Sequence, residues 1–454
     1  MAKGNTKDMT QGEPFKLILF FSVPLLIGNI FQQLYSMVDT IIVGKIIGTQ
    51  ALAAVGTTGP LNFLVLGFAS GITSGFAVLV AQRFGAGDER GVRRAVTSAT
   101  ILISIFTVVL TLASVLGTKA LLRMINTPDD IFEDAYRYIV VIFAGMVTML
   151  LYNFLACILR ALGDSKTPLY FLGLSSALNI GLDFLFIVNF ELGVAGAAWA
   201  TVISQGVSGI LCFVYIWKKL PILRLQKEDW KETERWMYRK HLMIGLPMAF
   251  QFSITAIGTV ILQGALNLFG STTIAAYTAA SKVEQLVTQP AGTFGVTMAN
   301  YSGQNLGADR VDRIREGVTK CTILTLCFSV LASVVLFAFG EPLSSLFIEG
   351  KQPEVVELAM TYLRICALFF PFLNMIFVYR NMLQGVGRSL MPLMAGVFEL
   401  IARSVVAFTL PGVLGYAGIC LAGPIAWVAA AVPLGITYIV VIRQMLKSWR
   451  LRQA

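Results

Sequence analysis

The chain has 454 residues, of which 56% are hydrophobic and 13% are charged, and its formal net charge is +10. A soluble domain carries roughly a quarter charged residues, so this composition excludes an ordinary soluble enzyme or binding module. Apolar runs of about 20 residues recur without amphipathic alternation, as in a polytopic membrane protein. The excess positive charge is therefore expected to reflect membrane topology, and no nucleic-acid partner is expected.

Twelve apolar runs are long enough to cross a bilayer, so we expect an all-α integral membrane protein. In chain order they cover residues 16–42, 52–81, 95–117, 135–159, 168–190, 193–217, 242–268, 273–300, 318–339, 356–380, 391–411 and 415–442. The N-terminus, every second connection and the C-terminal tail hold 27 of the 35 Lys and Arg residues. The opposite connections hold only Lys45, Lys119, Arg123 and Lys351. The positive-inside rule then predicts cytoplasmic termini in an inner or plasma membrane.

One long charged connection, residues 218–241, divides the chain. It predicts an N-terminal six-helix lobe (1–217), a cytoplasmic linker with some helix on the membrane surface, and a C-terminal lobe with a cytoplasmic tail (242–454).

The two halves repeat at an offset of 222–224 residues. The matching pieces are Ser22–Gly28 with Gly245–Gln251, Gln82–Asp88 with Gln304–Asp309, Ala161–Pro168 with Gly385–Pro392, and Leu192–Ala200 with Leu414–Ala422. Each half has six spans, so both enter the membrane with the same orientation. The predicted lobes are therefore related by a pseudo-twofold axis along the membrane normal, a layout typical of alternating-access transporters.

Cysteine and histidine usage gives no sign of a metal or cofactor site. The six cysteines lie in apolar runs without C-x-x-C spacing, so they are expected to be buried apolar residues. His241 is the only histidine, and no G-x-x-x-x-G-K-[ST] motif occurs. We expect a protein that is not an enzyme and that an ion gradient drives.

Two acids interrupt the apolar runs of the first half. Asp39 ends a polar stripe on span 1 that includes Gln33 and Ser36, and it either faces a transport pathway or is solvated at the outer interface. Asp183 lies just beyond the middle of span 5, on one face with Asn179, and either binds an ion or hydrogen-bonds a neighbouring helix. Their equivalents in the second half are Leu262 and Ala407, so the coupling site is expected in the N-terminal lobe.

The second half offers weaker candidates. Glu284 in span 8 either contacts a cation or pairs with a basic residue elsewhere. Glu399 and Arg403 are four residues apart, which favours a structural ion pair.

Small residues and prolines mark the packing of the helices. Gly67, Gly71 and Gly75 share one face of span 2 and predict a close helix contact. Pro24 lies in span 1, where it gives either a hinge or a static bend.

The stretch SVPLLIGNIFQQLYSMVDTIIVGKIIGTQALAAVG (Ser22–Gly56), with QRFGAGD and ILRALGDSKTP after spans 2 and 4, resembles the multidrug and toxic compound extrusion (MATE) transporters. The resemblance covers the whole chain. In the DinF-like branch, acids in helices 1 and 5 couple protons and bind substrate, and Asp39 and Asp183 match them. The NorM-like branch places acids in helices 7 and 10, whereas span 7 here has Gln251 and Thr255.

The resemblance implies a monomeric secondary antiporter that exports amphipathic, mainly cationic drugs and dyes in exchange for protons or sodium. A carboxylate in a partly dry cavity would hold a proton or an organic cation, but not both. Tyr35 and Asn153 are expected to line the cavity, with Glu284, Gln251 and Thr255 as contacts in the second lobe. A lipid-linked saccharide flippase is the alternative, and it would be expected to place basic residues in its cavity.

Overall fold

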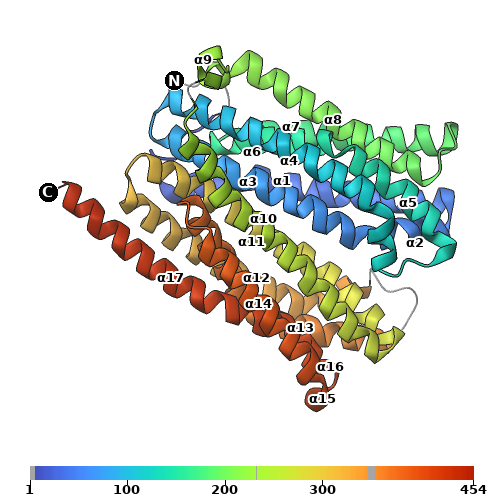
Figure 1. The fold of residues 1–454 in the computed structure, drawn as a ribbon. Helices are drawn as coiled ribbons and strands as arrows, with labels where there is room; N and C mark the ends of the chain where they lie inside the picture. Colours follow the sequence, from blue (N-terminus) through green and yellow to red (C-terminus); the bar gives the residue numbers. More distant parts are fainter. Residues whose placement is uncertain (1–5, 232, 346–352, 454) are drawn as a thin grey trace. The chain divides into compact units, whose positions relative to one another are not determined.

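The computed structural model describes residues 6–231, 233–345 and 353–453, and all regular structure in them is helical (Figure 1). Lys351, used above in the charge count, lies outside these residues. The first half contains α1 (Pro14–Ile42), η1 (Val43–Ile47), α2 (Thr49–Thr57), α3 (Gly59–Gly85), α4 (Glu89–Met124), α5 (Asp129–Ala144), α6 (Met146–Ala161), α7 (Lys166–Asp183), η2 (Phe184–Asn189), α8 (Val194–Lys219), η3 (Pro221–Leu223) and α9 (Lys227–Lys231). The second half contains α10 (Arg235–Leu266), η4 (Asn267–Phe269), α11 (Ser271–Gly307), α12 (Val311–Ser345), α13 (Pro353–Gly385), α14 (Leu390–Thr409), α15 (Pro411–Leu414), α16 (Tyr416–Cys420) and α17 (Ala422–Gln453).

Each predicted span falls on one helical segment, and some segments join shorter helices, such as α2 with α3 and α16 with α17. Ten of these segments are long and apolar enough to cross a membrane, and the bent pair α5 and α6, which meet at 47°, counts as one more. The remaining span is α11, which is 37 residues long but interrupted by polar residues such as Lys282 and Glu284. The predicted all-α membrane fold is therefore confirmed.

The chain forms two compact units. The first takes in residues up to Met9 together with Val23–Ser253, and the second takes in Thr10–Ser22 together with the residues from Ile254 onward. One boundary between the two units falls inside α1, between Ser22 and Val23, next to Pro24. The role of Pro24 as a hinge stays a prediction.

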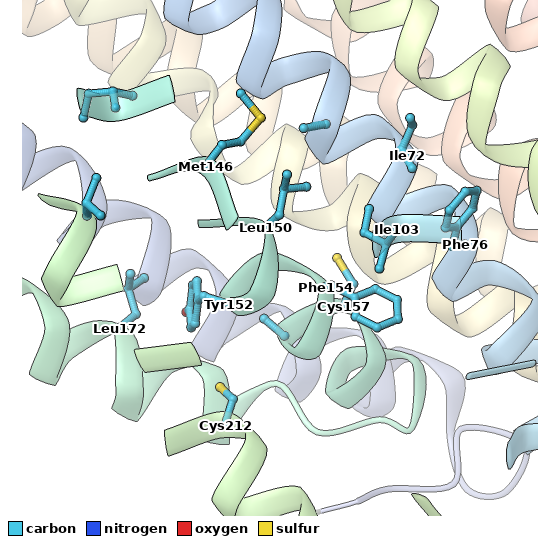
Figure 2. Close-up of a cluster of buried hydrophobic side chains, with 14 of the residues drawn as sticks. Ile72, Phe76, Ile103, Met146, Leu150, Tyr152, Phe154, Cys157, Leu172 and Cys212 are labelled. Atoms are coloured by element: carbon cyan, nitrogen blue, oxygen red, sulfur yellow. The ribbon is translucent and has the colours of Figure 1, made fainter. Parts of the chain in front are cut away.

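The core of the first unit lies where α3, α4, α6 and α8 meet. Figure 2 shows Ile72 and Phe76 of α3 close to Ile103 of α4 and to Phe154 and Cys157 of α6.

Glycines let α3 approach the first part of α10. A Cβ built on Gly71 would lie 2.6 Å from Ala249 Cα, and one on Gly75 would lie 2.4 Å from Gly245 Cα. Only hydrogen fits at these positions, so the predicted close helix contact is confirmed.

The linker is tied to the first unit by a buried ion pair. Asp229 of α9 is only 2% exposed and accepts a hydrogen bond from Arg93 Nε of α4 at 3.2 Å. His241, at the start of α10, is buried with its Nε2 3.0 Å from Ser98 Oγ of the same helix α4. This part of the linker therefore packs on α4, and its position on the membrane surface stays a prediction.

The second unit is built mainly from α11, α12, α13, α14 and α17. Inside it, Glu399 accepts from Arg403 Nη2 at 2.7 Å and from Arg380 Nη2 at 3.3 Å. The predicted Glu399–Arg403 pair is confirmed, with a second arginine that the sequence did not reveal.

The prediction that all six cysteines are buried was wrong at one position. Cys327 of α12 is exposed, while the other five are buried.

Candidate functional site

Two acids from distant parts of the chain meet in the first unit. The carboxyl of Asp39, near the end of α1, lies within hydrogen-bonding reach of the carboxyl of Asp183, the last residue of α7. Asp183 is fully buried and Asp39 is half-buried. Asp39 is therefore directed into protein rather than fully solvated.

Both acids precede a change of helix type. The π-helical segment η1 begins four residues after Asp39, and η2 begins directly after Asp183. The two segments contact each other. Short π-helical turns frequently occur at functional sites, because they leave backbone groups unpaired and rotate the side chains beside them.

The pair belongs to a cluster of hydrogen-bond acceptors. Asp39 Oδ1, both carboxyl oxygens of Asp183 and Asn179 Oδ1 are buried and accept no hydrogen bond from the described residues. The Asn179 amide donates instead to Thr201 Oγ1 of α8 at 3.4 Å. Ionised carboxylates only accept hydrogen bonds, so these oxygens need a donor from outside the described residues, such as water, a proton or another cation.

Tyrosine and glutamine side chains complete this cluster. The side chain of Tyr35, one turn before Asp39, hydrogen-bonds that of Gln205 from α8. Tyr138 of α5 is buried and interacts electrostatically with both acids. Sequence reasoning missed Tyr138, Gln205 and Thr201, although the i,i+4 spacing of the last two on an apolar helix was a usable signal.

A cavity of about 220 Å³ adjoins this cluster within the first unit. Its polar lining comes from Asn29, Gln32, Tyr35, Ser70, Tyr152, Asn153, Arg160, Ser165 and Gln205. The lining thus includes the predicted Tyr35 and Asn153, together with Pro24.

Some polar residues of α1 line the cavity, and another, Asp39, belongs to the acid pair. Gln32, Tyr35 and Asp39 follow helical spacing on one side, and the first two line the cavity. The predicted residues Gln33, half-buried, and Ser36, exposed, are not part of that lining.

The cavity also contains a basic residue that sequence reasoning overlooked. Arg160, in the last turn of α6, lines it beside Ser165 and Pro168. The absence of basic residues was the argument against a flippase, and Arg160 removes that argument. Its sequence signal was available, since an arginine lies inside ILRALGDSKTP at the end of an apolar run.

The second unit holds a separate polar cluster. The Tyr362 hydroxyl of α13 donates to Glu284 Oε2 of α11, and Tyr277 stacks edge-on against Tyr362 at 4.7 Å between ring centroids. Arg403 forms its ion pair with Glu399, so the two alternatives for Glu284, a cation contact or a basic partner elsewhere, stay predictions. Gln251 and Thr255 are half-buried on α10, the first in one unit and the second in the other.

No group of three or more His, Cys, Asp or Glu side chains within the part of the chain that the structure describes could hold a metal ion.

The sequence profile of the MatE family matches residues 24–185 and again residues 247–409. The chain belongs to the MATE family. The two matches begin 223 residues apart (247 − 24) and end 224 apart (409 − 185), so each half resembles the family separately. This spacing equals that of the internal repeat.

Individual relatives agree with this assignment. The probable multidrug resistance protein YpnP of Bacillus subtilis is 28% identical over 394 residues, covering 86% of this chain and 87% of its own length. The multidrug export protein MepA of Staphylococcus saprophyticus is 22% identical, with 89% of each chain covered. A MOP superfamily transporter from Pyrococcus furiosus has the same fold, with a TM-score of 0.90, 24% identity and coverage of 96% and 98%. These relatives are transporters and not enzymes.

Proposed function

We propose that this MATE protein is a secondary antiporter of the plasma membrane that exports amphipathic organic molecules, cations among them, in exchange for protons. Its relatives YpnP and MepA carry multidrug resistance and multidrug export in their names. The observation that carries the proposal is the cluster of buried acceptor oxygens at Asp39, Asn179 and Asp183, which no donor from the described residues satisfies.

The coupling follows from the chemistry of two adjacent carboxyl groups. When both are ionised they repel each other, and a single shared proton or one organic ammonium group relieves the repulsion. Proton and ammonium therefore compete for the same oxygens. If the cluster opens alternately to each side of the membrane, proton entry releases the drug outside and proton loss restores drug binding inside.

The test is efflux of the cationic dye ethidium from proteoliposomes, with a proton gradient and a sodium gradient imposed separately. Wild-type protein is expected to move ethidium under the proton gradient alone. Asp183→Asn and Asp39→Asn should each remove this coupled transport while the protein remains folded. Glu133→Gln, which removes an exposed acid paired with Arg137, is the matched control and should transport normally.

Efflux that a sodium gradient drives without a proton gradient would show that sodium is the coupling ion. The protein would still be an antiporter. Normal proton-driven efflux by both Asp variants would contradict the assignment of the site.

The flippase alternative requires a much larger ligand. A lipid-linked saccharide is several times larger than a compact drug, so the two functions differ in the size of the ligand that the protein must move. Movement of a labelled lipid-linked saccharide across the proteoliposome membrane, without ethidium efflux, would favour the flippase.

A further inference from the structure

Arg160 has donor groups that its neighbours in the protein do not use. Its Nε donates to the Ala156 carbonyl at 3.2 Å, and its Nη2 contacts Cys157 Sγ at 3.3 Å. A guanidinium has five N–H donors in a planar fork. Two are engaged by these contacts, and Arg160 is among the residues that line the 220 Å³ cavity.

No carboxylate neutralises this arginine among the described residues. The groups with which it interacts are Cys157, Tyr152 and Cys212. Asp164, the acid nearest in sequence, is buried and accepts from the backbone and hydroxyl of Thr167, so it caps the start of α7. By contrast, Arg380 and Arg403 of the second unit share Glu399. Arg160 is half-buried, and a guanidinium that is partly withdrawn from water without a counter-charge favours the binding of an anion.

We propose that Arg160 is an anion-binding subsite of this cavity, which takes the carboxylate or phosphate group of a transported small molecule. This inference rests on the proposed transport function and extends its substrates from cations to organic acids and zwitterions. The planar fork of arginine binds both anions through two parallel hydrogen bonds. A purely cationic ligand would instead meet a like charge at this point.

The anion subsite and the acid cluster are well separated. Arg160 lies beside Ser165 and Pro168 at the start of α7, and Asp183 is the last residue of that helix. The 18 residues of α7 span about 27 Å at 1.5 Å per residue. Arg160 thus selects an anionic group at one end of the lobe, and proton exchange occurs at the other.

The experiment compares two fluorescent probes that differ in one charge. N-(ethoxycarbonylmethyl)-6-methoxyquinolinium is a cationic ester, and its hydrolysis product carries a carboxylate on the same cationic ring. Dissociation constants are measured for purified full-length protein in chloride-free buffer, because chloride quenches the fluorophore. The variants are Arg160→Gln, Arg160→Lys and the control Arg137→Gln, whose guanidinium is exposed and paired with Glu133.

Arg160→Gln is expected to lower the preference for the carboxylate over the ester about tenfold, since a charge-assisted bidentate contact is lost. Arg160→Lys should retain part of the preference, and Arg137→Gln should retain all of it. Because the ratio is taken within one variant, partial misfolding does not alter it. An equal change for both probes, or no change, would overturn the proposal.

Two further arms separate the possible explanations. If wild-type protein moves neither probe across the proteoliposome membrane under any ion gradient, the proposed transport function is wrong. The ratio of the two dissociation constants would still test whether Arg160 binds the carboxylate. If Arg160→Gln loses affinity for short-chain phosphatidic acid but not for the carboxylate probe, the anion is a lipid headgroup. That outcome would overturn the assignment to a transported molecule.

Discussion

Asp39 and Asp183 are 144 residues apart in the chain (183 − 39), yet their carboxyl groups lie within hydrogen-bonding reach of each other. Three of their four carboxyl oxygens are buried without a donor from the described residues. Such an arrangement is unfavourable for folding in itself and is typical of sites kept for function.

Asp183→Asn is therefore expected to stabilise the protein although it abolishes coupling. The asparagine amide brings two N–H donors into a cluster of acceptors, so the free energy of unfolding should rise by about 1–3 kcal/mol. Thermal unfolding in detergent at neutral pH checks this. The opposite change, Asn179→Asp, adds an acceptor and should lower stability. A less stable Asp183→Asn would mean that this cluster is already satisfied in the folded protein.

The Glu399 cluster predicts a large loss of stability. Glu399 is 13% exposed, and Arg380 and Arg403 are 9% and 10% exposed, so all three charges are largely out of water. Glu399→Gln leaves two arginines without a counter-charge and should cost about 3–5 kcal/mol. Glu133→Gln breaks an exposed pair and should cost at most about 1 kcal/mol. Similar melting temperatures for the two variants would show that the Glu399 cluster contributes little.

The close approach of α3 to α10 predicts a steric effect. Gly71→Val would force a side chain into the Ala249 backbone, with an expected cost of about 1–3 kcal/mol or more. Gly173→Ala is the matched control, since a Cβ there meets nothing within 4 Å. Yield of monodisperse protein and its melting temperature are the measurements. A Gly71→Val protein as stable as Gly173→Ala would contradict the contact.

The buried pair of Asp229 and Arg93 predicts how the linker responds to mutation. Asp229 also accepts from the backbone N–H of Gln226 at 2.9 Å, which holds the turn before α9. Asp229→Asn should weaken both contacts and loosen the backbone around the exposed lysines of α9, which trypsin cuts more readily in an unfolded segment. Cleavage between residues 227 and 231 is expected to quicken several-fold relative to wild type, while Glu228→Gln, an exposed change in the same helix, should leave it unaltered. Equal cleavage rates would show that another contact holds the linker.

Helix positions could be predicted because they depend on local sequence. Apolar runs, proline and glycine positions and the spacing of basic residues all act within about 20 residues, which is why the spans agree with the observed helices. Asp39, Asp183 and Arg403 were noticed for the same reason, since a charge inside an apolar run is visible without any fold.

Spatial neighbours could not be predicted in this way. Tyr138 has no distinguishing signal in sequence, and the signals of Gln205 and Arg160 do not say what lies beside them. The helices α5, α6 and α8 bring these residues to the site through crossing angles set by side-chain packing. The sequence by itself determined a repeated helical membrane protein with two acids in its first half. Only the tertiary structure decided that these acids form one donor-free cluster and that an unpaired arginine lines the adjoining cavity, because both depend on contacts between helices far apart in the chain.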